Sequence, residues 1–367
     1  MNLSNFGIGA CVFGLSWWLT KRLASSSSKV HCLDHPNSRS LHLTPIPRTG
    51  GLAIFASFAV GISLFVPQVA LFGWSGDIHT IGGILGGLLL LAFVSFLDDR
   101  TGLPLQVRLA THVIISWAVV IIGQLALGVI VVPGLGSLPL RSMAIPLTIF
   151  YLVWMVNLYN FMDGMDGFAA GMAVIGFGFL SYLGWSGNHR SVGMMSLLAG
   201  AAACGFLFYN LPPAKIFMGD VGSTVLGFLA GAITLIGTRN GLFDFWAPVL
   251  IFSPFVVDST VTIFRRLLHG EVVWQAHRKH YYQRLVLAGW SHRKTVLVEY
   301  CLMVACGASA VIYTRLPPPY KPAIPLVWLL VYLTLIIGVR FVERGTKRKV
   351  PGSGEPLRLR PIARPGP

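Results

Sequence analysis

Charged residues are scarce in this chain of 367 residues. Asp, Glu, Lys and Arg together make up 11% of it, and only 13 residues are acidic, whereas a soluble domain carries roughly a quarter charged residues. Hydrophobic residues make up 54%, and the mean hydropathy is +0.70. This composition excludes an ordinary soluble domain and indicates a protein that lies in a lipid bilayer.

Two other features are missing. The five cysteines show no C-x-x-C or paired spacing, which excludes a disulfide framework and a zinc ribbon. No segment repeats another, so nothing in the sequence supports the inverted-repeat architecture of many transporters. A multispan transporter is nevertheless the alternative from another functional class.

The chain instead contains many apolar runs near the length that crosses a bilayer, about 20 residues. No basic residue precedes the first run, as it would in a signal peptide, so we expect this run to be retained. The sequence therefore predicts an all-α, polytopic integral membrane protein. The eleven predicted spans are residues 5–20, 51–72, 80–97, 108–126, 143–161, 167–184, 193–209, 221–238, 243–264, 295–313 and 322–340.

The 28 lysines and arginines are divided unevenly between the two sides of this predicted bundle. With the amino terminus outside, 23 lie on the side of the carboxyl terminus and 5 on the other. Loops rich in Lys and Arg stay cytoplasmic, which predicts a periplasmic N-terminus and a cytoplasmic C-terminus. Topology and attraction to anionic lipid then explain the net charge of +15, and nucleic-acid binding is not expected.

We expect a single transmembrane catalytic domain over residues 1–340, followed by a basic, disordered cytoplasmic tail at 341–367. Ionisable groups at the edge of a span are costly to keep and mark a functional site. The polar clusters fall in the cytoplasmic loops, so the chemistry is expected on that face. These loops are residues 21–50, 98–107, 162–167, 210–221 and 265–294.

Two clusters of acids and amides end predicted spans. The adjacent carboxylates Asp98 and Asp99 suit a metal or a phosphate, because mutual repulsion raises the proton affinity of one of them. A plain interfacial cap is the alternative. In the second cluster, Asn157 and Asn160 share a helix face and can reach toward Asp163, and nearby glycines allow a tight turn.

Two further clusters are rich in glycine and in basic residues. The segment from Phe217 to Ser223 precedes a predicted helix and is similar to a phosphate-facing loop. Oxygen ligands from Asp and Asn favour Mg²⁺, with Mn²⁺ as an alternative, bound jointly with a substrate phosphate. His277 and His280 have the spacing of a zinc pair, but two imidazoles among basic residues are typical of an anion clamp.

Taken in chain order, these motifs resemble the polyprenyl-phosphate N-acetylhexosamine-1-phosphate transferases. The resemblance extends from about residue 35 to 289 and implies transfer of a sugar-1-phosphate from a UDP-sugar to undecaprenyl phosphate in the bacterial inner membrane. It implies Mg²⁺ as cofactor and UMP as product. The motifs are Asp98-Asp99, Asn157-x-x-Asn160-x-x-Asp163-Gly-x-Asp166-Gly, Phe217-Met-Gly-Asp220-x-Gly-Ser, and the His/Arg loop that begins at His277.

The His/Arg loop differs between branches of that family. Peptidoglycan precursor transferases carry three histidines followed by a glutamate, whereas residues 277–284 read His-Arg-Lys-His-Tyr-Tyr-Gln-Arg. The chain therefore resembles the enzymes that begin O-antigen or related surface glycans, and the peptidoglycan enzyme is the alternative. The GlcNAc-specific members usually carry an acid before the arginine of this loop and a histidine run after it, where this chain has His277 and Tyr281-Tyr282. The loop therefore resembles the branch whose donors include deoxy sugars such as UDP-N-acetylfucosamine or UDP-N-acetylquinovosamine.

The resemblance also implies roles for individual residues. The expected catalytic residues are Asp98, Asp99 and Asp220. The expected metal ligands are Asp220 and Asn160. The expected substrate-binding residues are Asn157, Asp163, Asp166, Phe217, His277, Arg278, His280 and Arg48.

Of these, Asp98 is expected to take the proton from the lipid phosphate or to orient it, with Asp99 in support. Phe217 would stack on uracil, and Asp166 would accept from its ring N–H. The loop from His277 to His280 would hold the diphosphate. The implied partners are a UDP-N-acetylhexosamine, undecaprenyl phosphate and membrane lipid, and a homodimer is an open option.

Overall fold

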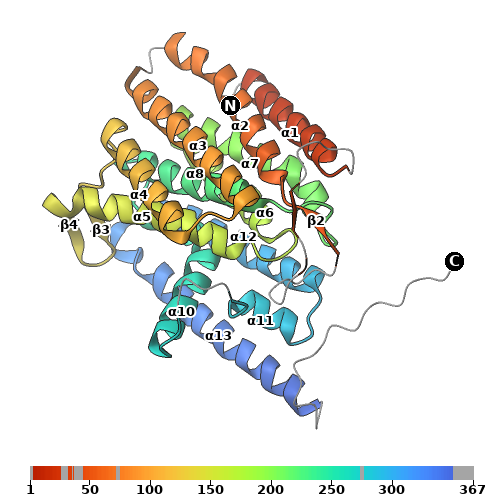
Figure 1. The fold of residues 1–367 in the computed structure, drawn as a ribbon. Helices are drawn as coiled ribbons and strands as arrows, with labels where there is room; N and C mark the ends of the chain where they lie inside the picture. Colours follow the sequence, from red (N-terminus) through yellow and green to blue (C-terminus); the bar gives the residue numbers. More distant parts are fainter. Residues whose placement is uncertain are drawn as a thin grey trace.

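The computed structural model describes residues 3–25, 32–34, 36, 44–71, 75–272 and 277–349. They form a bundle of helices with two small antiparallel hairpins (Figure 1), which confirms the predicted all-α architecture. The strands are β1 (Leu33–Asp34), β2 (Ile46–Pro47), β3 (Val129–Val132) and β4 (Gly136–Pro139). The α-helices are α1 (Leu3–Leu23), α2 (Gly50–Leu71), α3 (Ser75–Thr101), α4 (Leu105–Ile122), α5 (Ala144–Met162), α6 (Phe168–Ser186), α7 (Arg190–Asn210), α8 (Gly219–Arg239), α9 (Trp246–Ile251), α10 (Ser253–Leu268), α11 (Tyr281–Leu287), α12 (His292–Arg315) and α13 (Ala323–Lys349).

Nine helices in the described part of the chain are long and apolar enough to cross a membrane: α2 to α8, α12 and α13. Each corresponds to a predicted span, so the protein is a multi-pass membrane protein. The first predicted span is also a helix, α1, but it is not among the nine. Its Ser16 and Thr20 are fully buried, and the Ser16 hydroxyl donates to the carbonyl of Ala202 on α7 at 2.6 Å. These polar side chains lower the apolarity of α1.

The ninth predicted span, residues 243–264, is not one continuous helix, and this part of the prediction was wrong. The chain breaks at Phe252 into α9 with 6 residues and α10 with 16 residues. Pro254 lies in the first turn of α10, where a backbone N–H has no partner inside the helix and its absence costs nothing. The same proline cannot continue the preceding helix α9, because it lacks the N–H that this helix would need. Phe264 and Leu268 lie exposed on α10.

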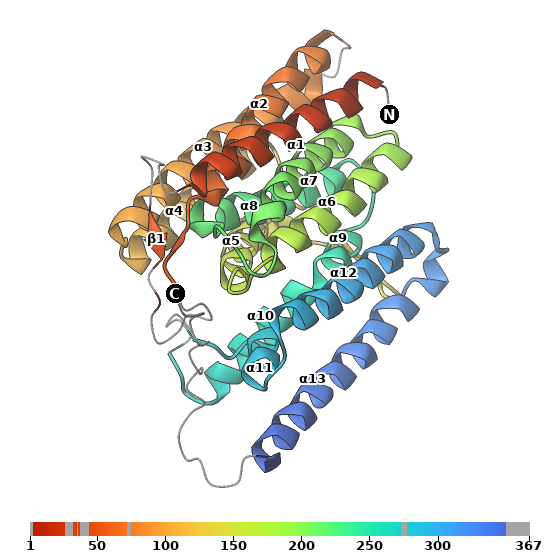
Figure 2. The ribbon, with the colours of Figure 1, turned by 90° about the vertical axis from the view of Figure 1, so that its right-hand side faces the viewer.

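The centre of the bundle is α8. Within its span, 94% of the residues are buried, and its main neighbours are α5, α3 and α2. A helix that is apolar on all sides belongs in such a position. Figure 2 shows α1, α2 and α3 along one flank of the bundle and α12 and α13 along the other, with α8 between them.

The polar clusters meet where α3 and α5 end and α8 begins. The predicted loop boundaries shift here, because α3 continues to Thr101 and α8 already starts at Gly219. Asp98, Asp99 and Asp220 therefore lie in terminal helical turns instead of loops, which fixes their directions. Much of the predicted first loop, at residues 26–31, 35 and 37–43, and the predicted tail from residue 350 on lie outside the described residues.

Candidate active site

A small cavity of about 70 Å³ opens between α3, α4, α5 and α8 at this end of the bundle. Such a volume admits a few water molecules or a partly hydrated ion, but not a nucleotide. Larger substrates must therefore bind across its mouth. Its polar lining consists of Ser95, Asp98, Arg108, His112, Asn157, Asn160, Asp220 and Thr224.

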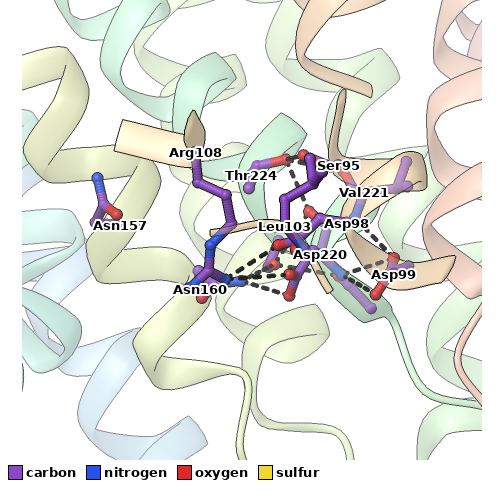
Figure 3. Close-up of polar contacts among 12 residues, drawn as sticks. Ser95, Asp98, Asp99, Leu103, Arg108, Asn157, Asn160, Asp220, Val221 and Thr224 are labelled. Atoms are coloured by element: carbon purple, nitrogen blue, oxygen red, sulfur yellow. Dashed lines mark hydrogen bonds and ion pairs between the residues drawn. The ribbon is translucent and has the colours of Figure 1, made fainter. Parts of the chain in front are cut away.

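Arg108 is the cation of this cavity. It lies one turn into α4, and Figure 3 shows its side chain reaching toward the carboxylates of α3 and α8. Its Nη1 atom is 3.0 Å from Asp98 Oδ2 and 3.7 Å from Asp220 Oδ2. The Arg108 side chain is 38% exposed, so part of it faces solvent. One arginine thus bridges two carboxylates and still presents donors to a ligand.

Asp98 is held by the turn that follows it. Its Oδ1 atom accepts from the backbone N–H of Leu103 at 2.6 Å, and its Oδ2 atom faces Arg108. The side chain is 7% exposed. Both oxygens therefore have donors, and the carboxylate is fixed in the lining of the cavity.

Asp99 points toward a different helix from Asp98. Its carboxylate accepts from the backbone N–H groups of Asp220, at 3.0 Å, and Val221, at 3.4 Å. These are orphan donors of the first turn of α8, so Asp99 caps this helix from outside. Gly219 is required at the start of α8 because its φ is +71° and an added Cβ would collide with the backbone carbonyl oxygen of Arg48.

This cap changes the interpretation of the glycine segment before α8. The α8 amides that a phosphate-facing loop would offer are already bound to Asp99. Arg48 supports the same carboxylate, with Nε 3.5 Å from Asp99 Oδ1 and a guanidinium hydrogen bond to the Asp99 carbonyl. Arg48, predicted to bind substrate, therefore braces Asp99 in this structure.

Asp220 and Asn160 lie together, as the sequence predicted. The Asn160 amide nitrogen donates to Asp220 Oδ1 at 2.8 Å and to Ser223 Oγ at 3.1 Å. Asp220 is 29% exposed at the cavity mouth, and its carboxylate faces the same Arg108 nitrogen as that of Asp98. Two carboxylates from α3 and α8 thus share one cavity with an amide from α5.

Asn157 lies one turn before Asn160 and on the same face. Its amide nitrogen is 3.3 Å from His112 Nδ1 and donates to the carbonyl of Val153 at 2.7 Å. It therefore links α5 to α4 and does not reach Asp163. His112 follows Arg108 by four residues, so both side chains face the cavity from one side of α4.

The turn between α5 and α6 carries the remaining acids of that motif. Gly167 has a φ of +74°, which confirms the predicted tight turn. Asp166 Oδ2 accepts from the backbone N–H of Ala214 at 3.0 Å, so it ties this turn to the α7–α8 connection. Burial of the Asp163 carboxyl, and then the charge of Asp220, raises the pKa of Asp163 well above its usual range.

Phe217 is fixed by its backbone. Its N–H donates to the carbonyl of Pro47 at 2.7 Å, and its carbonyl accepts from Gly50 at 3.0 Å. The segment before α8 thus pairs with the segment before α2. The Phe217 side chain is partly exposed, three residues before Asp220.

The His/Arg loop connects α10 to α11. The rings of His277 and His280 stack with centroids 4.8 Å apart. His277 Nδ1 accepts from the backbone N–H of Lys279 at 3.2 Å, which leaves Nε2 as the protonated nitrogen of the neutral ring. Burial, and then the positive charges around it, lower the pKa of His277 to about 4. Arg278 forms no ion pair with any residue that the structure describes.

The donor set fits a magnesium ion in one respect only. Among the described residues, no three His, Cys, Asp or Glu side chains are grouped closely enough to enclose a metal. Mg²⁺ however commonly takes one or two carboxylates and fills its other positions with water and substrate phosphates, and Asp220, 29% exposed at the cavity, can supply one. The Asn160 amide nitrogen donates a hydrogen bond to Asp220. The Asn160 oxygen could therefore bind a metal at Asp220 only after the side-chain amide flips.

Sequence reasoning missed Arg108, His112 and Asp258. Arg108 was counted only as a topological charge, although an arginine one turn inside an apolar helix is itself a signal of function. His112 at the i+4 position was the accompanying signal. Asp258 lies inside the ninth predicted span, and its partners could be found only from the fold.

Comparison with known proteins identifies a family and several relatives. The family model described as "Glycosyl transferase family 4" matches residues 81–238, which include the ends of α3, α5 and α7 and all but the last residue of α8. The chain is 33% identical over 300 residues to a probable undecaprenyl-phosphate N-acetylglucosaminyl 1-phosphate transferase of Bacillus subtilis (strain 168), covering 80% of each chain.

Two further relatives have similar names. The decaprenyl-phosphate N-acetylglucosaminephosphotransferase of Mycobacterium tuberculosis (strain ATCC 25618 / H37Rv) is 29% identical, over 85% of this chain and 83% of its own. The undecaprenyl-phosphate alpha-N-acetylglucosaminyl 1-phosphate transferase of Escherichia coli (strain K12) is 26% identical, over 74% of each chain.

Proposed function

The chain belongs to the polyprenyl-phosphate N-acetylhexosamine-1-phosphate transferases, and we propose that it transfers the sugar-1-phosphate of UDP-GlcNAc, or of a deoxy relative such as UDP-N-acetylfucosamine or UDP-N-acetylquinovosamine, to undecaprenyl phosphate. UMP is released, and the lipid-linked sugar begins an O-antigen or related surface glycan. The observation that carries the proposal is the Asp98–Arg108–Asp220 cluster at one end of the bundle. The N-acetylglucosamine donors named for the relatives support the choice of sugar class.

Arg108 is the residue best placed for the acceptor phosphate. It combines a positive charge with exposed donors, and a guanidinium matches phosphate geometry. Asp98 orients it, since the carboxylate accepts from Arg108 at 3.0 Å and from Leu103 at 2.6 Å. A carboxylate paired with an arginine is a weak base, and a phosphate monoester is already mostly ionised at neutral pH. Orientation, rather than proton removal, is therefore the role that the contacts of Asp98 favour.

The donor diphosphate would bind on the Asp220 side of the cavity. Asp220 would hold Mg²⁺, or Mn²⁺ in its place, and Asn160 would orient Asp220. When bound there, the ion would neutralise charge on the diphosphate as the phosphoryl group transfers. His277 and Arg278 supply further donors from the α10–α11 loop, and Phe217 offers a ring for the uracil. Asp99 acts indirectly, because it fixes the first turn of α8 and hence Asp220.

The side on which this cluster lies is proposed to be the cytoplasm of a bacterium. The split of lysines and arginines, 23 against 5, supports this orientation in the inner membrane. The absence of a three-histidine run at residues 277–284 speaks against the peptidoglycan precursor as substrate. The position of the acids at one end of the bundle speaks against transport, which requires polar groups near the bilayer midplane.

An assay with purified protein in detergent tests the proposal. We expect UMP and a diphosphate-linked lipid when undecaprenyl phosphate, Mg²⁺ and one UDP-N-acetylhexosamine of a panel are combined, and no turnover with EDTA. Asp244→Asn is a matched control, because Asp244 pairs with Lys321 at 2.8 Å well away from the cavity. Turnover of UDP-MurNAc-pentapeptide alone, or full activity without metal, would contradict the proposal.

A further inference from the structure

A second group of polar contacts lies outside the cavity, where α10 meets the start of α11. At its centre is Asp258 of α10, whose side chain is only 11% exposed. Its Oδ1 atom is 3.1 Å from His280 Nδ1, and the Thr262 hydroxyl donates to the same oxygen at 3.0 Å. A carboxylate with so little exposure is costly to keep unless it is paired and hydrogen-bonded, and Asp258 has several such partners.

Asp258 also binds the backbone of α11. The N–H of Tyr281 donates to Oδ1 at 3.1 Å, and the N–H of Tyr282 donates to Oδ2 at 3.3 Å. These belong to the first turn of α11, whose amides have no partner inside the helix. His280, at the N-cap position, makes no capping bond with its own side chain, so the Asp258 carboxylate takes that place from another helix.

The contact with Asp258 also fixes the orientation of the His280 ring. Because Nδ1 faces the carboxylate at 3.1 Å, Nε2 on the opposite side of the ring points away from Asp258 and is left for a ligand. Without Asp258 the ring loses both its orientation and its nearby counter-charge.

The rings continue from His280 toward the acids of the active site. His277 stacks on His280 at 4.8 Å, His280 stacks on Tyr282 at 5.9 Å, and Tyr282 meets Phe168 at 4.5 Å. A Cβ added to Gly164 would lie 2.3 Å from the Tyr282 hydroxyl, so α11 lies directly against the turn that carries the motif acids of α5. The His/Arg loop and that turn thus form one packed unit that Asp258 fastens to α10.

We propose that Asp258 is a positioning residue for the donor: it holds His280, and through it the loop from His277, at the place where the diphosphate of a UDP-sugar binds. The proposal rests on the proposed function, which makes this loop part of the donor site. Asp258 itself does not touch the substrate. Its effect must therefore pass through His280.

A double-mutant cycle measures this dependence. UDP with Mg²⁺ serves as the probe, and calorimetry gives its dissociation constant for wild type, Asp258→Asn, His280→Ala and the double variant. Asn keeps one acceptor oxygen but loses the charge and the second acceptor. We expect each single change to weaken UDP binding about tenfold, the low end for a residue that orients a ligand-binding histidine. The double variant should bind UDP no more weakly than the weaker-binding single variant, because both changes disable the same unit.

Two controls separate this result from a structural defect. Asp244→Asn removes an acid that is equally buried, at 9% exposure, and should leave UDP binding unchanged. If Asp258→Asn does not purify as a folded protein, Asp258→Glu replaces it in the cycle, since Glu keeps the charge but displaces the carboxylate by one methylene. Losses that multiply in the double variant, to about a hundredfold, would overturn the positioning role. If wild type and Asp258→Asn bind UDP equally well, the positioning role alone is overturned. If wild type does not bind UDP, the proposed function is overturned as well.

Discussion

Replacement of Arg108 should weaken binding of the acceptor lipid without weakening binding of the donor, so it tests which side of the cavity each substrate uses. In Arg108→Gln the side chain keeps a hydrogen-bond donor but loses its charge and its fork of N–H groups. Asp98 keeps its bond from the Leu103 N–H at 2.6 Å, so the turn between α3 and α4 stays anchored. The change therefore acts on the cavity while leaving the helices in place.

The expected size of the effect follows from one charge-assisted interaction. A hydrogen bond to a charged group contributes about 1.5 to 3 kcal/mol, and every 1.4 kcal/mol is a factor of ten. The KM for undecaprenyl phosphate should therefore rise about 10- to 100-fold. Binding of Mg²⁺ should not weaken, because a cation that lies 3.7 Å from Asp220 Oδ2 repels a second cation, and its loss relieves that repulsion.

Steady-state assays with each substrate varied in turn measure this effect. Arg100→Gln is the matched control: Arg100 lies only eight residues earlier, but its guanidinium carbon lies over the Phe96 ring at 4.6 Å and does not enter the cavity. We expect both KM values of this control to stay within about twofold of wild type, inside the 0.5 kcal/mol typical of surface changes. An unchanged acceptor KM in Arg108→Gln, or an equal rise in the donor KM, would refute the assignment of Arg108.

Two other variants test neighbouring roles. Asp98→Asn should still bind UDP-sugar with Mg²⁺ in calorimetry, because Asp98 serves the acceptor side, but its kcat/KM for undecaprenyl phosphate should fall about 10- to 100-fold, since one charge-assisted hydrogen bond that positions Arg108 is weakened. Asp220→Ala should instead lose metal-dependent nucleotide binding, and the reverse pattern would exchange the two roles. His277 has a pKa lowered to about 4, against about 6.5 in an unfolded chain, so the unfolded state binds more protons between these values and stability is lost as the pH falls from about 6.5. His277→Gln should therefore show a smaller fall in unfolding temperature between pH 7 and pH 5 than wild type, and an identical fall in both proteins would show that His277 titrates normally.

The sequence predicted the bundle well because a bilayer imposes one strong rule. A helix that crosses it needs about 20 apolar residues, and nine predicted spans are such helices. The break at Phe252 was visible in principle, because Pro254 and Pro248 stand inside the ninth run. Apolarity alone cannot decide between a kink and a complete break, since that depends on what each half packs against.

The pairing of Asp98 with Asp99 shows where sequence reasoning ends. Adjacent residues on a helix point about 100° apart, so two neighbouring carboxylates need not share a ligand. Here Asp98 faces Arg108 in the cavity, whereas Asp99 caps α8. The sequence identifies both as costly charges at a span end, but only the packing of α3 against α8 gives them different tasks.

The charge balance of the cavity connects this packing to the proposed chemistry. Asp98 and Asp220 contribute two negative charges and Arg108 one positive charge, so the cavity alone does not attract two phosphorylated substrates. A divalent cation at Asp220 would reverse the sign, and the donor diphosphate could then approach from one side while Arg108 holds the acceptor phosphate on the other. Arg108 belongs to α4 and Asp220 to α8, 112 positions apart in the chain, so this division between donor and acceptor depends on the way the two helices pack around α3.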